Sequence, residues 1–434
     1  MSSQPTDKPP LMPLYAVVFI GTLGFSIVLP FLVFLVLRLG GNAMIYGLVG
    51  SAYSLCQLVG APVLGAWSDR FGRRRILLLS QGGTAVAWLL FLVALALPIT
   101  PLAAVDSAWL GSFTLTIPLV LVLLARALDG LTGGNISVAN AYLADVTDED
   151  SRQVAFGRLA MAQNLGFVVG PALAGLLGGW GEAAPIWAAL TISGAALVLI
   201  AWRLPESAPC VWVTRPTNSV RKVLGQEQRD CHEAQGAKRL GLRKIFSLPD
   251  VGLLLGLQFL VFLAFNFFYV TLPVHSATSL DWTLREVGLF LAYFSALMVV
   301  SQGPLLSWAS RKLSDGHLVR TGGALLAVGF ATLSSGSAQA LLLGVPVVAL
   351  GNGLLWPSLL ALVSRAAGSA QGAVQGVAGS TGAVASVLGL VIGGLVFERL
   401  GSGVFLLSSA LAGLAFFSSI FLRPHEQLPP PRTP

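Results

Sequence analysis

Long uncharged apolar runs, separated by short charged segments, dominate the chain from residue 14 to residue 422. A helix needs about 20 mostly apolar residues to cross the hydrocarbon core of a bilayer. Windows of roughly this length, bounded by charges or by Pro and Gly clusters, occur at 14–37, 44–67, 76–98, 113–142, 155–179, 184–204, 250–274, 285–308, 318–337, 339–364, 371–396 and 402–422. The pattern therefore predicts an all-α integral membrane protein with twelve transmembrane helices. The segment 98–115, with Pro98, Pro101, Asp106 and Trp109, predicts an extended external loop.

One long polar stretch, residues 205–249, divides the twelve windows into two sets of six. It predicts an N-terminal six-helix bundle at 1–204, a cytoplasmic linker at 205–249, a C-terminal six-helix bundle at 250–422 and a cytoplasmic tail at 423–434.

An internal repeat supports this division, although Gly-rich membrane helices also resemble one another by composition alone. Gly170 and Gly175 align with Gly389 and Gly394 at the same offset along the chain. Repeated halves with a site at their interface are typical of secondary transporters.

The composition excludes a water-soluble enzyme, because 55% of the 434 residues are apolar and only 10% are charged, against about 25% charged in soluble domains. The formal net charge of +7 lies in short loops rather than on a face, so we expect no nucleic-acid partner. Cys56, Cys210 and Cys231 are too few and too scattered for a disulfide framework or a zinc site. No Walker sequence occurs, and we expect no ATP, cofactor or metal.

The positive-inside rule sets the expected orientation. With the N-terminus inside, nearly all of the 26 Lys and Arg residues face the cytoplasm, and Arg38, Arg285 and Arg399 lie outside. We therefore expect both termini to be cytoplasmic. The N-terminus lacks the features of a signal peptide, so the first helix is expected to remain as an anchor. The scarcity of Lys beside Arg indicates a GC-rich source, which fits a bacterial inner (plasma) membrane and leaves a eukaryotic organelle open as the alternative. We expect a monomer.

The turn after the second window reads GAWSDRFGRRRIL, residues 65–77. A basic turn of this kind could simply fix the topology. Its spacing nevertheless resembles the G-x-x-x-D-R-x-G-R-R/K signature of the major facilitator superfamily, through Gly65, Asp69, Arg70, Gly72, Arg73 and Arg74. Residues 126–150 and 166–175 are similar to two further motifs of its tetracycline and multidrug antiporter branch.

The resemblance implies the major facilitator fold and a role for each motif. Asp69 would face the N-terminus of the eleventh helix, and Arg73 would pair with Asp145 in a cytoplasmic gate. The alternative for Asp145 is a solvated residue in an acidic run. The resemblance assigns the antiporter motif to Gly166, Gly170, Pro171 and Gly175. This motif would control a leak by letting helices pack closely. The alternative is that these glycines serve only the close packing common to membrane helices.

Arg126 and Asp129 are ionisable residues within the fourth window. Spaced i and i+3, they lie on one helix face and can pair, and intramembrane charges are functional by default. We hypothesise that Asp129 carries a coupling proton, with Arg126 keeping it ionised until substrate or a conformational change separates them. A purely structural ion pair is the alternative. Gly21 stands where this branch often carries an acid in the first helix, which leaves a uniporter or a symporter open.

Polar and aromatic residues inside the apolar windows are candidates for a substrate cavity, although interhelical hydrogen bonds would also explain them. They are Gln57, Asn135, Asn140, Asn164, Asn266, Tyr269, Tyr293, Asn352 and Trp356. A mostly apolar cavity with a few polar anchors suits a lipophilic small-molecule substrate.

The sequence thus predicts a secondary transporter, not an enzyme, and the resemblance implies that it is a proton-coupled exporter of small hydrophobic or drug-like compounds. Two alternatives remain open. One is an importer or uniporter of a nutrient such as a sugar or organic acid. The other is a non-transporting receptor or scaffold whose basic loop recruits a partner or anionic lipid.

Overall fold

The computed structural model describes residues 11–107, 109–133, 135–147, 149–181, 183–207, 245–367 and 371–422. Most of the expected linker, residues 208–244, and the expected tail, 423–434, lie outside the described residues. In the first half the helices are α1 (Met12–Arg38), α2 (Ala43–Phe71), α3 (Arg73–Ala96), α4 (Ile117–Thr132), α5 (Asn135–Val146), α6 (Glu149–Gly178) and α7 (Ala184–Arg203).

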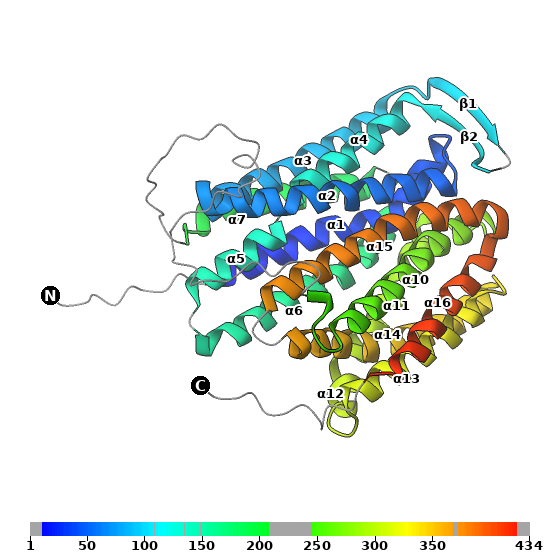
Figure 1. The fold of residues 1–434 in the computed structure, drawn as a ribbon. Coiled ribbons are helices and arrows are strands. Elements are labelled where there is room, and N and C mark those ends of the chain that lie inside the picture. The colour runs from blue at the N-terminus through cyan, green and yellow to red at the C-terminus, as the bar shows by residue number, and fades with distance from the viewer. Residues whose placement is uncertain are drawn as a thin grey trace.

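The second half is also helical (Figure 1). Its elements are α10 (Val251–Thr278), α11 (Leu284–Val300), the π-helical turn η1 (Ser301–Leu305), α12 (Leu306–Ala309), α13 (Asp315–Leu333), α14 (Ala338–Ala367), α15 (Gln371–Leu400), the 3-10 turn η3 (Gly401–Gly403) and α16 (Val404–Ser419). Polar caps mark several helix starts. The Asn42 side chain accepts from the Ile45 N–H at α2, and Thr283 with Glu286 forms a capping box at α11.

Ten segments of the described chain are long and apolar enough to span a membrane. One of them, Val374–Ser419, contains both α15 and α16, which η3 separates, and α13 is a further helix of 19 residues. Counting these apart gives the twelve spans that the sequence predicts. The first six pack as α1 to α7 and the second six as α10 to α16.

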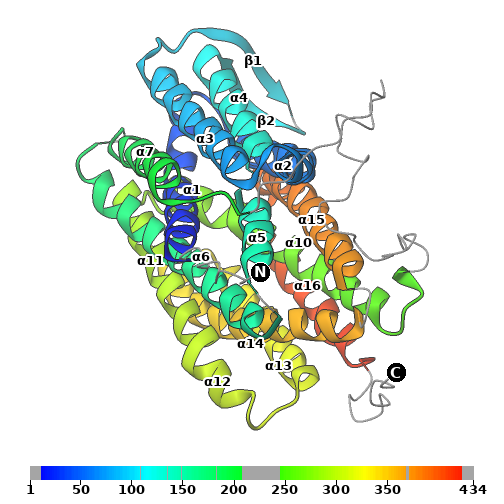
Figure 2. The same cartoon turned by 90° about the vertical axis from the view of Figure 1, so that its left-hand side faces the viewer.

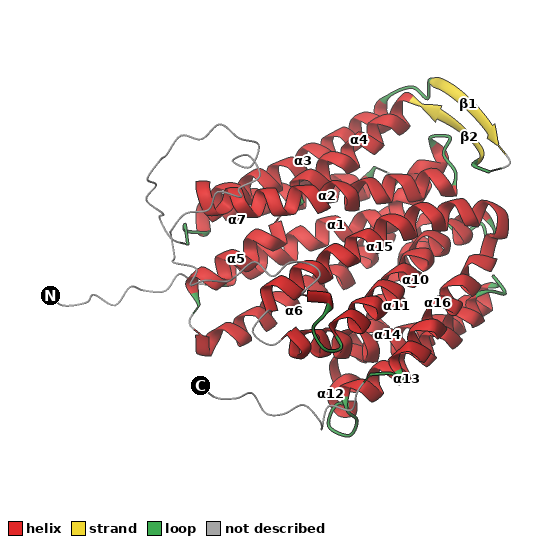
Figure 3. Ribbon diagram, viewed as in Figure 1, coloured by secondary structure: helices red, strands yellow, loops and turns green. Residues whose placement is uncertain are grey.

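Two details of the prediction are wrong. The segment 98–115 is not an extended loop, since it forms an antiparallel hairpin of β1 (Pro101–Ser107) and β2 (Gly111–Thr116), the one pair of strands in the described residues (Figure 3). Val105 pairs with Phe113, and Gly111 takes the positive φ of 71° that the turn requires. The fourth window therefore begins too early, because its helix starts at Ile117.

The fourth span is also two helices rather than one. α4 ends at Thr132, and α5 begins at Asn135, whose side-chain oxygen accepts from the Ile136 N–H. Gly133 lies in the break, and glycine weakens a helix interior. The break brings the backbone carbonyl of Gly133 within reach of Gln57.

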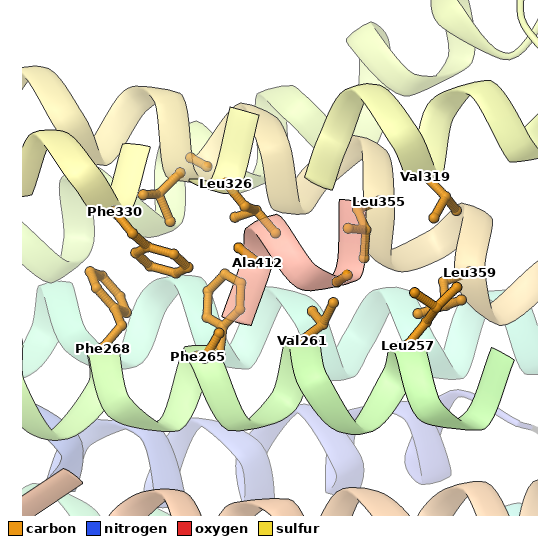
Figure 4. Close-up of a cluster of buried hydrophobic side chains, with 14 of the residues drawn as sticks. Leu257, Val261, Phe265, Phe268, Val319, Leu326, Phe330, Leu355, Leu359 and Ala412 are labelled. Carbon is orange, nitrogen blue, oxygen red and sulfur yellow. The ribbon is translucent and has the colours of Figure 1, made fainter. Parts of the chain in front are cut away.

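Each half has its own apolar core. In the second half, Phe265 and Phe268 of α10 face Phe330 of α13, with ring centroids 5.6 Å apart in both pairs (Figure 4). In the first half, Trp88 is fully buried, and its indole N–H donates to Ser193 of α7 at 3.1 Å. The helices of each half are therefore fixed to one another.

The halves meet where α2 packs on α15 and α6 packs on α11 (Figures 1 and 2). We call the end of the molecule that holds the hairpin, Ala43 and Leu400 the hairpin end. The opposite end, with Arg73, Asp145 and Arg320, is the basic end. Close backbone contacts join the halves at the hairpin end, where a Cβ on Gly394 would lie 2.9 Å from Met44 Cα.

Candidate functional site

Arg126 and Asp129 form a buried ion pair in α4. The Arg126 Nη1 and Asp129 Oδ2 atoms lie 3.1 Å apart, and their side chains are only 4% and 5% exposed. A charge at the bilayer centre costs about 2.5–3.5 kcal/mol on insertion scales. Direct pairing of the two charges at positions i and i+3 offsets this cost. The i, i+3 spacing in the sequence predicts this pairing.

Neighbouring helices complete the surroundings of the pair. Thr84 of α3 donates from Oγ1 to Asp129 Oδ1 at 2.9 Å, so each carboxylate oxygen has its own partner. The Arg126 guanidinium lies 4.5 Å from the centroid of the Tyr53 ring and 5.5 Å from that of Phe25. The Arg126 Nε is buried without a hydrogen-bond partner. The arginine is therefore held by two aromatic faces and one carboxylate.

One predicted cavity residue, Gln57, adjoins this site, and a second, Asn135, lies beside Gly21 of α1. Gln57 of α2 donates to the Tyr53 hydroxyl at 2.9 Å and to the Gly133 carbonyl at 3.0 Å. Asn135 fills the space beside Gly21, because a Cβ on Gly21 would lie 2.9 Å from Asn135 Nδ2. A side chain at position 21 would therefore require the Asn135 amide, the end of a flexible side chain, to shift.

Sequence reasoning missed Thr84 and Tyr53. Tyr53 precedes Gln57 by one helical turn, and Thr84 is a polar residue in an otherwise apolar stretch of α3. Both signals were present in the sequence, but nothing in it shows that either residue contacts the ion pair.

Arg73 of the basic turn binds two residues of the turn and one residue of α5. Its guanidinium lies 2.5 Å from Asp69, 3.0 Å from Asp145 and 2.6 Å from the Ser68 hydroxyl. Gly72 takes a φ of 98° between α2 and α3, where a side chain would also meet Glu206. The turn therefore ties α2, α3 and the end of α5 together.

The other residues of this motif have separate roles. Arg70 stacks on the Phe71 ring at 5.1 Å, Arg74 donates to carbonyls at the end of α7, and Gly65 has open space where its Cβ would be. In the part of the chain that the structure describes, no hydrogen bond or ion pair links Asp69 to α15. Residues 368–370 and the side chains of the first residues of α15 lie outside the described residues, so the expected position of Asp69 beside that helix N-terminus stays a prediction.

The antiporter motif divides between two neighbours. Gly166 and Gly170 pack on α1, where Ser26 donates to the Gly166 carbonyl at 2.8 Å. Gly175 packs instead on Gly288 of α11, across the halves, with a hypothetical Cβ 2.9 Å from the Gly288 carbonyl carbon. Pro171 lies inside α6 between these two contacts. The motif thus fixes α6 both within its half and to the other half.

The remaining candidates lie apart from the ion pair. Asn266 of α10 donates to the Phe262 carbonyl at 2.8 Å and to Ser386 of α15 at 3.2 Å, and Trp356 packs edge-on against Phe262 at 4.7 Å. Asn352 contacts the Met298 sulfur at 3.6 Å. Tyr269 and Tyr293 are 38% and 39% exposed, Asn164 is exposed, and Asn140 is half-buried. Asn266 and Gln57 therefore make the interhelical bonds that were the alternative to substrate contacts.

The family model described as Major Facilitator Superfamily matches residues 14–316 and 254–434. The chain belongs to the Major Facilitator Superfamily. It is 25% identical over 425 residues to the class D tetracycline resistance protein of Salmonella ordonez, covering 96% of this chain and 98% of the relative. It is 24% identical over 387 residues to multidrug resistance protein 2 of Bacillus subtilis (strain 168), covering 88% and 87%.

A solved structure supports the same fold. The crystal structure of the human organic anion transporter MFSD10 (TETRAN) superposes with a TM-score of 0.64 at 20% identity, covering 96% of this chain and 100% of that chain. The protein is therefore a multi-pass membrane transporter of the major facilitator fold, with tetracycline and multidrug resistance proteins among its relatives.

Proposed function

We propose that this transporter exports small hydrophobic, drug-like compounds in exchange for protons, by alternating access between two six-helix bundles. The buried Arg126–Asp129 pair, held by Thr84, is the observation that carries the proposal. The names of the relatives, which are tetracycline and multidrug resistance proteins, support the substrate class, and the motifs that resemble those of antiporters support the direction of transport. The basic end would be cytoplasmic, the termini would lie on that side, and the transporter would act as a monomer in a plasma membrane.

The charges of the site suggest how a proton could be coupled. With Asp129 ionised, the pair is neutral and the Arg126 side chain is held between its carboxylate and the rings of Tyr53 and Phe25. A proton on Asp129 would neutralise its carboxylate and weaken the ion pair with Arg126. The site would then carry the net positive charge of the Arg126 guanidinium, which would need other polar or charged groups to stabilise it. Protonation would thus favour one arrangement of the site over the other, which is what coupling to a conformational change requires.

One observation favours a second candidate, a uniporter or symporter. Asn135 occupies the space beside Gly21, where the antiporter branch often carries an acid. If Asp129 cannot supply the missing proton site, transport would proceed without proton exchange.

Purified protein in proteoliposomes that enclose a pH-sensitive dye separates antiport from uniport, and the sign of the pH change inside the vesicles separates antiport from symport. Tetracycline, a cationic dye and a neutral hydrophobic drug are added in turn. We expect compound-dependent proton movement in the wild type and its loss in Asp129→Asn, which keeps an oxygen acceptor for Thr84 but cannot ionise. Asp106→Asn is the matched control, because Asp106 is an exposed acid of the hairpin. Compound flux without proton movement would replace antiport with uniport.

A further inference from the structure

The hairpin end carries a contact between the halves that the proposed proton site does not use. Glu398, in the last turn of α15, belongs to the second half, and its Oε1 accepts from the Ala43 N–H of the first half at 2.7 Å. Ala43 is the first residue of α2. The first N–H groups of a helix have no partner within the helix, and that end of the helix dipole attracts negative charge.

The tip of the hairpin covers this contact. Asn42 Nδ2 donates to the Leu110 carbonyl at 2.8 Å, and a Cβ on Gly111 would lie 2.7 Å from Glu398 Oε2. Trp109 at the tip stacks on the guanidinium of Arg399 with a separation of 3.8 Å. Two adjacent residues of α15, Glu398 and Arg399, are therefore bound to two segments of the first half.

The hairpin itself is anchored to the first half. The Thr114 N–H donates to the Gly40 carbonyl at 2.8 Å, and Thr116 Oγ1 donates to the Leu39 carbonyl at 2.8 Å. Both acceptors lie in the turn between α1 and α2. The hairpin and the start of α2 therefore form one surface against which the end of α15 rests.

We infer that Glu398, Arg399, Ala43 and Trp109 form a clamp that holds the transporter closed at the hairpin end. Alternating access has to separate the halves at this end once in every cycle. The opening must then remove the Glu398 carboxylate from the α2 N-terminus and Arg399 from the Trp109 ring. The strength of this hairpin clamp sets the balance between the two open states. The inference depends on membership of the fold family and is independent of proton coupling.

Distances between spin labels test the clamp in the full-length protein. Cys56, Cys210 and Cys231 are replaced by Ser in a background that keeps transport. One label pair, at Leu102 and Ser279, reports the hairpin end, and another, at Trp202 and Phe421, reports the basic end; all four side chains are exposed. Pulsed electron paramagnetic resonance then gives the fraction of molecules open at each end.

Glu398→Gln removes the charge and keeps the size of the side chain. We expect the ratio of molecules open to molecules closed at the hairpin end to rise about tenfold, equivalent to about 1.4 kcal/mol, because charge-assisted hydrogen bonds are stronger than neutral ones. Trp109→Ala should shift it in the same direction by about threefold, as expected for an exposed cation–π contact. The basic-end labels should move closer together in both variants.

Glu286→Gln is the matched control. Glu286 is an acid at the same end and in the same half, but it caps its own helix through Thr283. We expect the Glu286→Gln distances to equal those of the parent. If Glu398→Gln keeps the parental distances, or if Glu286→Gln shifts them as much, the clamp is wrong. Glu398→Asp, tested in parallel, should retain a closed population larger than that of Glu398→Gln.

Discussion

Arg74 of α3 and Arg320 of α13 occupy equivalent positions in the two halves. Arg74 donates from Nε to the Ile200 carbonyl at 3.3 Å, at the end of α7. Arg320 donates to the carbonyls of Ser419, Ile420 and Leu422 at 3.2, 3.3 and 3.2 Å, at the end of α16. Each arginine thus extends from the third span of its half to the last carbonyls of the sixth.

This relationship predicts a loss of stability when the arginine is removed. The last carbonyls of a helix have no partner within the helix, and hydrogen bonds to charged groups contribute about 1.5–3 kcal/mol each before exposure reduces them. Arg320→Ala should therefore lower the Tm in detergent. Arg320→Lys should restore only part of the lost Tm, because a lysine ammonium cannot reach all three carbonyls at once. Arg311→Ala, at an exposed arginine, should leave the Tm unchanged. An equal Tm for Arg320→Ala and the parent would contradict the capping role.

The ion pairs at the basic end have opposite charge order in the two halves. In the first half, a base near the start of α3 pairs with an acid at the end of α5, as Arg73 with Asp145 at 3.0 Å. In the second half, an acid at the start of α13 pairs with a base at the end of α14, as Asp315 with Arg365 at 2.9 Å. The positions correspond while the charges are exchanged.

The two pairs should differ in importance. The Arg73 side chain is 13% exposed and holds three partners, whereas that of Arg365 is 56% exposed, and exposed pairs contribute about 0–1 kcal/mol. We expect Arg73→Ala to slow transport in proteoliposomes by more than about tenfold, and Arg365→Ala by less than about twofold. Initial rates at equal protein content measure this. Similar rates for the two variants would contradict this prediction, because they would show that transport depends equally on the Arg73–Asp145 and Arg365–Asp315 ion pairs.

The sequence predicted the helices because a bilayer imposes the length of each apolar run. It predicted the Arg126–Asp129 and Arg73–Asp145 pairs because helical spacing or a family motif placed each base near its acid. The hairpin was missed since its short strands lie between prolines and carry few charges. The contact of Glu398 with Ala43 joins residues 355 positions apart, and no local sequence pattern predicts a contact over such a separation.

The reversed pair in the second half was missed for a different reason. The family motif specifies a fixed sign at each position, so Asp315 and Arg365 do not match it although they occupy the corresponding places. Thr84 was overlooked because a hydroxyl within an apolar helix commonly bonds to its own backbone. Only the packing of α3 on α4 directs it to Asp129.

Thr84 should act as a positioning residue for the proton on Asp129. Thr84→Val keeps the shape but removes the hydroxyl that donates to Asp129 Oδ1. A hydrogen bond to the charged form favours that form, so its loss should move the pH of half-maximal transport to higher values. Thr84→Ser should restore the parental pH profile. A role in packing alone would change the amount of folded protein and leave the profile of Thr84→Val unaltered.

The contact between Gly175 and Gly288 should tolerate no side chain. A Cβ on Gly288 would lie 2.6 Å from the Gly175 backbone nitrogen, whereas a Cβ on Gly413 of α16 would meet nothing within 4 Å. In open space, replacing a helical glycine by alanine stabilises by about 0.5–1 kcal/mol. Gly413→Ala should therefore raise the Tm slightly, while Gly288→Ala should lower it and lengthen the hairpin-end label distance, because α6 and α11 must separate. A rise in Tm for both variants, with unchanged distances, would mean that the helices do not pack this closely in the membrane.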